Sequence, residues 1–266
     1  MLGDHGRLPA ALHTRAQRVM KGLDTRAIEV AQRTDVGKLR EANEDACGHS
    51  EVLGNGCLLF VADGMGGHAG GATASRLAVE TLAREFPKDA GDPGRALGAG
   101  MESVNRRVFE EARRNPELHG MGTTGVALLF APEGRAYVAN VGDSRAYRLR
   151  NGELAQLTSD HSLVAELVRR DVLTEEQARV HPRRNELLRS LGVDGEVEID
   201  LECFEVEPGD CYLLCSDGLC GVLRDAEIQA LLEESSPAEA AERLVDAAND
   251  AGGPDNVTVM IARVPI

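Results

Sequence analysis

The sequence has no long apolar run, no run of basic residues and no tryptophan. Its apolar segments, such as residues 57–62, are far shorter than the ~18–20 residues of a membrane-spanning helix, so no membrane span is expected. With 29 basic and 44 acidic residues, the chain carries a formal charge of −15. This charge repels nucleic acid and anionic membrane surfaces, so DNA and RNA are excluded as expected partners.

The six cysteines lack the spacing of a redox or zinc motif, because no two of them are separated by two residues. Scattered thiols within apolar segments are typical of small core side chains in a reducing compartment. Cys211 and Cys215 are predicted to share one face of a strand. The amino terminus also lacks the uninterrupted apolar core of a secretory signal, so we expect a cytoplasmic protein.

The first 26 residues differ in charge from the rest of the chain. They contain five Lys or Arg and two Asp, and we interpret residues 1–26 as a basic N-terminal extension with a short helix at about residues 9–22. Two alternatives stay open for this extension: a segment that lies on the acidic body or engages a partner, and a solvated tail. The remaining residues are numerous enough to bury one core without disulfides or a structural metal.

Strand-like and helical segments alternate from residue 27 onward. Apolar runs predict strands at residues 28–31, 57–62, 126–130, 136–141, 146–149, 199–206, 211–215 and 257–264. Helical periodicity predicts helices at residues 71–86, 95–114 and 237–251, and a shorter one at 162–168 with Asp160 as its N-cap. Residues 171–196 follow neither pattern and are interpreted as an insertion.

Two short connections indicate antiparallel strands. Asn151-Gly152 stands between AYRLR and ELAQLT and is typical of a hairpin, and Pro208-Gly209-Asp210 predicts a turn between ECFEVE and CYLLC. Neither connection is long enough for a crossover helix. We therefore expect a largely antiparallel sheet with helices covering its faces.

Four carboxylates mark the ends of predicted strands. Asp63 follows CLLFVA, Asp143 follows AYVANVG, Asp217 follows CYLLCS, and Asp255 precedes VTVMIARV. Each Asp-Gly pair alone fits an ordinary turn, but several acids beside one core are costly unless a cation compensates them. Oxygen ligands without His or Cys select Mg²⁺ or Mn²⁺ rather than zinc. Together the four acids predict a site for a hard divalent cation.

The segment ADGMGGHAGG adds five glycines beside the first of these acids. Glycine lets the backbone approach a ligand closely, and a glycine carbonyl can itself coordinate a cation. The segment is not a phosphate-binding P-loop, because the pattern GxxxxGK[ST] is absent from the sequence.

Six segments in order carry a resemblance to a known family: LREANEDA, VADGMGGHAGG, GMGTTGVALL, NVGDSRAYRLRNGELAQLTSDHS, LLCSDGL and GGPDNVTVMIARV. They closely resemble the bacterial PP2C (PPM) family of metal-dependent serine/threonine protein phosphatases. The resemblance implies an α+β fold, a four-layer α-β-β-α sandwich with two antiparallel sheets. It further implies that residues 27–266 are the catalytic domain, with a flap at about residues 171–196.

The resemblance also implies roles for individual residues. Asp63 matches the acid that bridges two metal ions, the Gly64 carbonyl matches a further ligand, and Asp217 and Asp255 match the other metal-binding acids. Glu44 matches the acid that reaches the second ion, supported by the neighbouring Asp45. Asp143 matches a ligand of a third ion. Arg40 matches the arginine that binds the substrate phosphate.

The implied activity is hydrolysis of phosphoserine and phosphothreonine by direct attack of a hydroxide that bridges two Mn²⁺ or Mg²⁺ ions. The implied partners are phosphoproteins and a bacterial Ser/Thr kinase that the enzyme opposes, and a monomer is expected. The alternative is a catalytically weak phospho-dependent binding or regulatory module of the same fold. A nuclease or phosphodiesterase with the same metals is disfavoured by the −15 charge.

Some positions depart from the family or stay open. Met65 stands where animal members have a histidine, and His68 does not replace it. Asn185 stands nearest to a flap serine that holds the third ion in relatives, which leaves that ion open. His161 is interpreted as structural. The flap arginines are interpreted either as a receptor for an acidic phosphopeptide or as a solvated helix face: Arg169, Arg170, Arg179, Arg183, Arg184 and Arg189.

Overall fold

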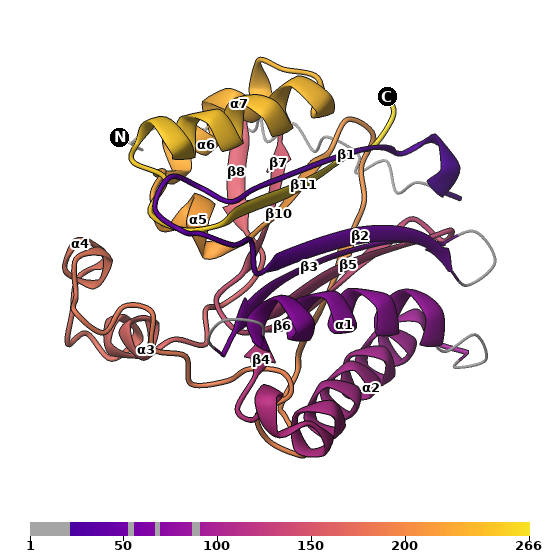
Figure 1. Cartoon of the computed structure of the whole chain (residues 1–266). Coiled ribbons are helices and arrows are strands. Elements are labelled where there is room, and N and C mark those ends of the chain that lie inside the picture. Colours follow the sequence, from indigo (N-terminus) through magenta and orange to yellow (C-terminus); the bar gives the residue numbers. More distant parts are fainter. Residues whose placement is uncertain (1–21, 53–55, 67–69, 87–90) are drawn as a thin grey trace, which may run out of the picture.

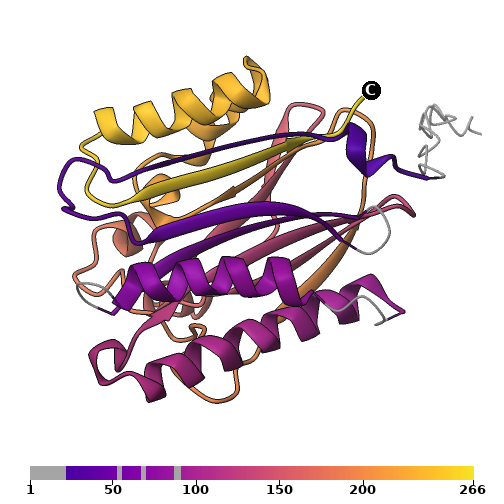
Figure 2. The same cartoon turned by 45° about the vertical axis from the view of Figure 1, so that its right-hand side comes forward.

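Two antiparallel sheets lie face to face in the computed structural model of the chain, and helices cover both outer faces (Figures 1 and 2). The structure describes residues 22–52, 56–66, 70–86 and 91–266. The expected N-terminal helix falls outside these residues except for its last position. Within the described ranges, none of the helices is both long and apolar enough to cross a membrane. The predicted α+β sandwich of four layers is confirmed.

Each sheet is assembled from strands far apart in the sequence. The first sheet has the order β1 (Glu29–Asp35), β11 (Val257–Arg263), β10 (Cys211–Cys215), β7 (Arg145–Arg150) and β8 (Glu153–Gln156). The second has the order β2 (Asp45–Val52), β3 (Gly56–Met65), β5 (Gly125–Ala131), β6 (Arg135–Val141) and β9 (Asp200–Glu205), with β4 (Gly122–Thr123) beside β3. Short 3₁₀ turns occupy Thr25–Ala27 and Pro116–Leu118.

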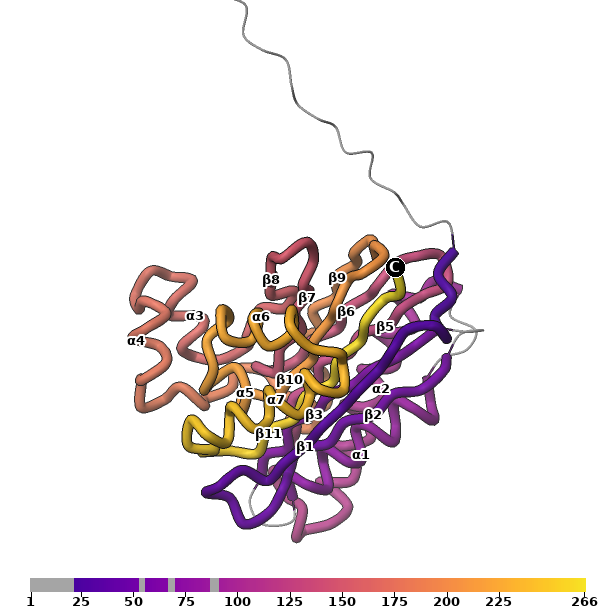
Figure 3. The backbone as a smooth tube through the Cα atoms, turned by 90° about the horizontal axis from the view of Figure 1, so that it is seen from above, coloured from indigo at the N-terminus to yellow at the C-terminus, as the bar shows by residue number. Residues whose placement is uncertain are grey.

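Helices form the two outer layers and the flap. The second sheet is covered by α1 (Gly70–Glu85) and α2 (Pro93–Arg114), and the first by α5 (Asp217–Cys220), α6 (Asp225–Glu233) and α7 (Pro237–Asp250). Helix α3 (Leu163–Arg169) leads into the predicted flap and α4 (Glu175–Arg179) lies within it, and both project from one edge of the sandwich (Figures 1 and 3). The insertion predicted from residue 171 therefore contains a short helix.

Three buried layers hold the four-layer stack together. In β3, Leu58 and Phe60 pack against α1 and α2, whereas Leu59 and Val61 pack between the sheets. Alternation along a strand places these pairs on opposite faces, so burial of both faces explains the unbroken apolar run of this segment. The strand β10 is built in the same way, with one face turned to α7 and the other to the second sheet.

The cysteine predictions agree with this packing. Cys211 and Cys215 lie on one face of β10, in the core beneath α7. All six cysteines are free. Burial raises the pKa of Cys47 and Cys57 to about 11, so these thiols are protonated near neutral pH.

The predicted hairpin at Asn151-Gly152 is confirmed, with both residues at positive φ (52° and 75°) and Arg150 paired with Glu153. The turn at residues 208–210 is also present, but its two strands do not pair with each other. Strand β9 pairs with β6 in one sheet, and β10 pairs with β7 and β11 in the other. This turn carries the chain across the sandwich.

An ion pair between Arg150 and the buried Asp210 lies at the point where the chain crosses between the sheets. The Nε and Nη2 atoms of Arg150 each donate to Asp210 at 2.6 Å, and Nη1 of Arg150 lies 2.7 Å from Glu207. Asp210 is 1% exposed and also accepts from the Tyr212 hydroxyl at 3.0 Å. These contacts fix where the chain leaves one sheet and enters the other.

One further sequence prediction is wrong, and some short or polar elements were not predicted. The N-cap of α3 is Ser162, whose hydroxyl accepts from the Ala165 amide, and Asp160 instead binds Arg145 at 2.7–3.1 Å. Strand β2 was not predicted, because DACGHSEV is an edge strand with few apolar residues and only partial burial. Helices α5 and α6 were also not predicted, since each is too short for helical periodicity.

We predict that Arg150→Met lowers the free energy of unfolding by about 3–5 kcal/mol, because the buried Asp210 carboxylate would lose its cation. The measurement is urea unfolding followed by circular dichroism. Arg76→Met is the matched control, since Arg76 forms an exposed pair with Glu80 and its loss costs less than about 1 kcal/mol. Equal losses in the two variants would contradict a structural role of the Arg150 pair.

Candidate metal centre

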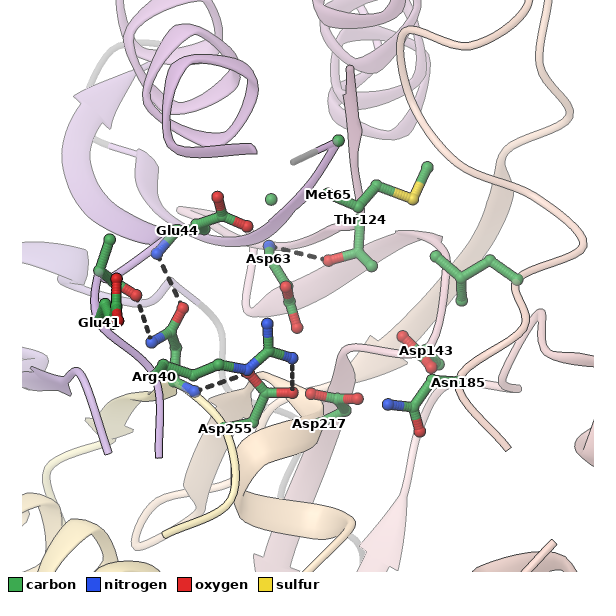
Figure 4. A pocket seen from close by; sticks show the side chains of 15 residues that line it. Arg40, Glu41, Glu44, Asp63, Met65, Thr124, Asp143, Asn185, Asp217 and Asp255 are labelled. Atoms are coloured by element: carbon green, nitrogen blue, oxygen red, sulfur yellow. Dashed lines mark hydrogen bonds and ion pairs between the residues drawn. The ribbon is translucent and has the colours of Figure 1, made fainter. Parts of the chain in front are cut away.

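A pocket of about 720 Å³ opens at one end of the sandwich. All seven residues expected to bind metal or phosphate line it: Arg40, Glu44, Asp63, Gly64, Asp143, Asp217 and Asp255. Figure 4 shows Asp63, Asp217 and Asp255 directed toward a common space, with Asp143 and Asn185 at the flap side. The structure thus brings together residues that are up to 215 positions apart.

The sandwich topology explains this convergence. Asp63 lies near the end of β3 in one sheet, whereas Asp217 follows β10 and Asp255 precedes β11 in the other. Because β10 and β11 are antiparallel neighbours, the end of one strand lies beside the start of the next. Asp143 occupies the loop between β6 and β7, where the chain passes from the second sheet to the first.

The two Asp-Gly pairs are not turns. Asp63-Gly64 lies inside β3, and Asp217-Gly218 begins α5. A Cβ atom on Gly64 would overlap the Gly71 carbonyl oxygen, and one on Gly218 would overlap the Asn256 carbonyl oxygen. Glycine is required at both positions because two backbone segments approach each other beside a pocket carboxylate.

Burial and mutual repulsion disfavour negative charge on these acids. Burial raises the pKa of Asp63 well above its ordinary value, and the charges of Asp45 and Asp217 raise it further. Burial and the charge of Asp217 also raise the pKa of Asp143 well above its ordinary value. Burial and the charge of Asp255 raise the pKa of Asp217. A hydrogen bond with Asp63 and the positive charges of Arg40 and Arg184 lower it, and the net shift is upward.

Asp45 lies directly behind the site, opposite Asp63 in the β2–β3 register. It accepts from the Ser216 hydroxyl at 2.7 Å, while its Oδ1 atom is buried with no partner among the described residues. Burial raises the pKa of Asp45 to about 7, despite hydrogen bonds from Ser216 and Thr258. The family resemblance implies only a supporting role for Asp45 beside Glu44, because Asp45 does not mark the end of an apolar run.

Two polar side chains that sequence reasoning did not identify hold the backbone of the site. The amide group of Asn256 donates to the carbonyls of Val36 and Ala42 at 2.9 Å and accepts from the Glu44 amide at 2.8 Å. The hydroxyl of Thr124 accepts from the Asp63 amide at 3.0 Å. Only the position of Asn256 directly after a strand-end acid pointed to it.

Glu44 lies at the wall of the pocket, against the start of α1. A Cβ atom on Gly71 would stand 2.7 Å from the Glu44 Oε2 atom. The partial positive charge at a helix N-terminus favours a carboxylate at this position. The Glu44 carbonyl also accepts from the Gly64 amide at 3.1 Å, which ties the loop before β2 to β3.

Arg40 stands at the pocket mouth with its Nη2 atom 2.7 Å from Asp255, and half of its side chain is exposed. Partial burial lowers the pKa of Arg40, but Asp255, Glu44 and Asp217 raise it, and the net shift is upward. The guanidinium is therefore permanently charged and presents its remaining N–H groups to the pocket.

Most of the flap arginines are engaged within the protein. Ion pairs join Arg169 and Arg170 to Glu166, Arg183 to Glu186, and Arg189 to Glu198 and Asp200. Arg179 donates to the Leu223 carbonyl at 3.3 Å. Arg184 is exposed, and its charge reaches Asp217 in the pocket. Of the six arginines, Arg184 is the one whose positive charge lowers the pKa of Asp217.

The family described as Protein phosphatase 2C matches residues 39–253. The chain belongs to this family. It is 42% identical over 235 residues to the serine/threonine phosphatase stp of Listeria welshimeri, covering 86% of this chain and 93% of that one. It is also 42% identical to PstP of Mycobacterium tuberculosis over 90% of this chain and 46% of that longer protein.

Solved structures agree with this assignment. The catalytic domain of PstP in complex with two manganese ions superposes with a TM-score of 0.81 at 40% identity, covering 90% of this chain and 99% of that chain. Stp1 from Staphylococcus aureus superposes with a TM-score of 0.84 at 34% identity over the full length of both chains. The family fold is therefore shared, and dependence on Mn²⁺ or Mg²⁺ is the norm of this family.

The pocket fits such ions by the chemistry of its donors. Its walls offer carboxylate and carbonyl oxygens, which hard dications prefer, and Asp217 Oδ1 is buried with no partner among the described residues. In the described ranges, no three His, Cys, Asp or Glu side chains are grouped closely enough to hold an ion by themselves. The Asp255 carboxylate pairs with Arg40 at 2.7 Å.

We predict that Gly64→Ala strongly destabilises the protein, by more than about 3 kcal/mol, because the new methyl group meets backbone rather than a movable side chain. Urea unfolding and soluble yield measure this. Gly195→Ala is the matched control, since the nearest atoms to its Cβ belong to the Phe109 ring at 3.6 Å. A Gly64→Ala protein as stable as the control would disprove the close approach at β3.

Proposed function

We propose that this chain is a protein serine/threonine phosphatase that hydrolyses phosphoserine and phosphothreonine with two Mn²⁺ or Mg²⁺ ions. The observation that carries the proposal is the convergence of Asp63, Asp217 and Asp255 with Arg40 in one pocket. A phosphate ester needs cations around its oxygens and a nucleophile activated near neutral pH. The named relatives at 36–42% identity support the same activity.

We propose that the ligands of the two ions are Asp63, Asp217, Asp255 and the Gly64 carbonyl. Glu44 would reach the second ion. When bound, these ions supply Lewis-acid activation of water and neutralise phosphate charge. Asp63 and Asp217 are half-buried, and the Oδ1 atom of Asp217 is shielded from water. Thr124 and Asn256 fix the backbone from which these acids project.

Arg40 has the role of binding the substrate phosphate. Its fork can donate two parallel hydrogen bonds to phosphate oxygens, which a lysine ammonium cannot do. The contact with Asp255 holds the guanidinium at the pocket mouth before substrate arrives. Met65 lines the pocket without an ionisable group, so it takes no part in proton transfer.

We also propose where the protein acts, a third ion site and the extent of the catalytic domain. We propose a cytoplasmic monomer that opposes a Ser/Thr kinase, with free cysteines as expected in a reducing compartment. Asp143 is proposed as a ligand of a third ion, with Asn185 beside it at the pocket wall. The proposed catalytic domain spans residues 27–266, and residues 22–26 pack against it through the buried Leu23. The basic segment 1–26 is proposed as an extension to this domain.

The alternative, a catalytically weak binding module, is disfavoured by the complete set of acids. A module that only recognises phosphate would need Arg40 but would not need several carboxylates buried beside one another. The acids repel both each other and a phosphate group unless cations are bound. Their retention in one pocket therefore supports catalysis.

We predict that the purified protein hydrolyses p-nitrophenyl phosphate with Mn²⁺ and loses this activity with EDTA. Asp217→Asn should lower kcat/KM at least about 100-fold, because several kcal/mol of charge stabilisation are lost and each 1.4 kcal/mol is tenfold. Asp250→Asn is the matched control, since Asp250 is 88% exposed on α7. Turnover that persists in EDTA, or none on any phosphopeptide with Mn²⁺, would refute the proposed function.

We predict that Arg40→Lys lowers kcat/KM about 10- to 150-fold, largely through KM, because a charge-assisted hydrogen bond of about 1.5–3 kcal/mol is lost. Steady-state kinetics on an aryl phosphate and on a phosphothreonine peptide measure this. Arg33→Lys serves as the control, because Arg33 forms surface pairs with Glu242 and Asp246. An unchanged KM in Arg40→Lys would show that the phosphate is bound elsewhere.

A further inference from the structure

Glu41 is an exposed carboxylate at the mouth of the pocket, directly after Arg40. Among the described residues, no cation or hydrogen-bond donor contacts its carboxylate, whereas Arg40 pairs with Asp255 at 2.7 Å. In the view of Figure 4, Arg40 and Glu41 lie at the opposite end of the pocket from Asp143 and Asn185. The charge of Glu41 is therefore available to a ligand, beside the group proposed to bind its phosphate.

The other charges of the pocket balance once two dications are bound. Carboxylates beside bound cations are ionised, so the two ions and Arg40 bring five positive charges against five negative ones. The five acids concerned are Glu44, Asp63, Asp143, Asp217 and Asp255. Among the described residues that line the pocket, Glu41 is then the carboxylate without a compensating charge. A cationic group on the ligand would supply that charge.

The loop that carries Glu41 is held firmly by its neighbours. The amide group of Asn256 donates to the carbonyls of Val36 and Ala42, each at 2.9 Å. Gly37 has φ = 79°, and a Cβ atom there would overlap the backbone just before Asn256. Because the backbone on both sides of Glu41 is fixed, its carboxylate is presented at a constant place relative to Arg40, as discrimination between ligands requires.

The residue on the other side of Arg40 is apolar and uncovered. Leu39 is 73% exposed. Lysine and arginine side chains lay their methylene stems on apolar surface while the charged head stays in a polar environment. Leu39 and Glu41 therefore flank Arg40 in the chain and offer the two kinds of contact that a basic side chain makes.

We infer that Glu41 is a specificity-determining residue, which selects phosphopeptides with Lys or Arg directly beside the phosphorylated residue. Successive residues of an extended peptide are ~3.3–3.6 Å apart, so the neighbouring side chain lies close to this loop when Arg40 holds the phosphate. An acidic neighbour is repelled by Glu41. The inference rests on the proposed function, which supplies the phosphate in the pocket.

The test measures the binding of peptides that carry a non-hydrolysable phosphonate analogue of phosphothreonine, by fluorescence anisotropy with Mn²⁺ present. The peptides differ only in the residue directly before or directly after the phosphonate, which is Lys, Ala or Glu. At one of these positions, the Lys peptide should bind the wild-type protein about 2- to 5-fold more tightly than the Ala peptide, the effect of an exposed ion pair. The Glu peptide should bind more weakly by a similar factor, and high salt should reduce both differences.

Two variants at one position test the role of the charge. Glu41→Gln keeps the size of the side chain and should remove the preference for Lys over Ala, whereas Glu41→Lys should reverse it in favour of Glu. Glu153→Gln, at an exposed glutamate on β8, is the matched control and should keep the wild-type preference. Equal binding of the Lys and Ala peptides by the wild-type protein would overturn the inference. So would a preference that persists in Glu41→Gln, or no binding of any of these peptides.

Turnover of the corresponding phosphothreonine peptides separates this inference from the proposed function. A protein that prefers the Lys peptide through Glu41 but hydrolyses none of the phosphothreonine peptides refutes the proposed function and leaves the selection intact. A protein that hydrolyses all of them with Mn²⁺ but binds the Lys, Ala and Glu peptides equally refutes the selection alone.

Discussion

Several half-buried carboxylates gathered in one pocket at the end of a β-sandwich are the constraint on which the rest of this structure depends. Removing Asp63, Asp143 and Asp217 from water raises their pKa values, and each acid raises that of its neighbours. Such a cluster is stable only where the surrounding backbone is held firmly and where cations compensate the charge. The pocket wall accordingly includes Thr124 and Asn256, whose side chains hold main-chain positions by hydrogen bonds.

The sandwich provides this firm support through its three buried layers. Strands β3, β5, β10 and β11 have side chains packed on both faces, so their ends have little freedom to move. The acids project from these ends or from the loops beside them. Glycine at positions 64 and 218 then lets neighbouring backbones approach closely enough for acids from both sheets to share one space.

Away from the pocket, two polar connections keep the layers in order. Arg150 and Asp210 join the strands on either side of the sheet crossing with contacts of 2.6 Å. His161 and Asp200 join the base of the flap to the loop before Asp143. Both connections are buried or partly buried, where the low local dielectric strengthens a hydrogen bond. The flap is thereby attached to the frame at its base, while its helices project from the sandwich.

The sequence by itself identified the acids and the arginine that gather in one pocket, and most of the regular elements. Long periodic helices and apolar runs with both faces buried are visible in one dimension, because their pattern follows from local geometry. The strand-end acids and the absence of His and Cys among them were enough to predict a hard-metal site. Edge strand β2 and the short helices α5 and α6 were missed, since few apolar residues or few turns leave no period to detect.

Tertiary structure alone decided the contacts between segments distant in the sequence. The sequence of the turn at residues 208–210 is typical of a hairpin, but the turn joins two different sheets. A glycine at positive φ is compatible with both kinds of connection, so the local sequence does not distinguish them. The pairing of Arg40 with Asp255, of Asp45 with Ser216 and of His161 with Asp200 links residues 215, 171 and 39 positions apart. Polar partners at such separations leave no periodic signal, so only packing of the two sheets and the flap determines them.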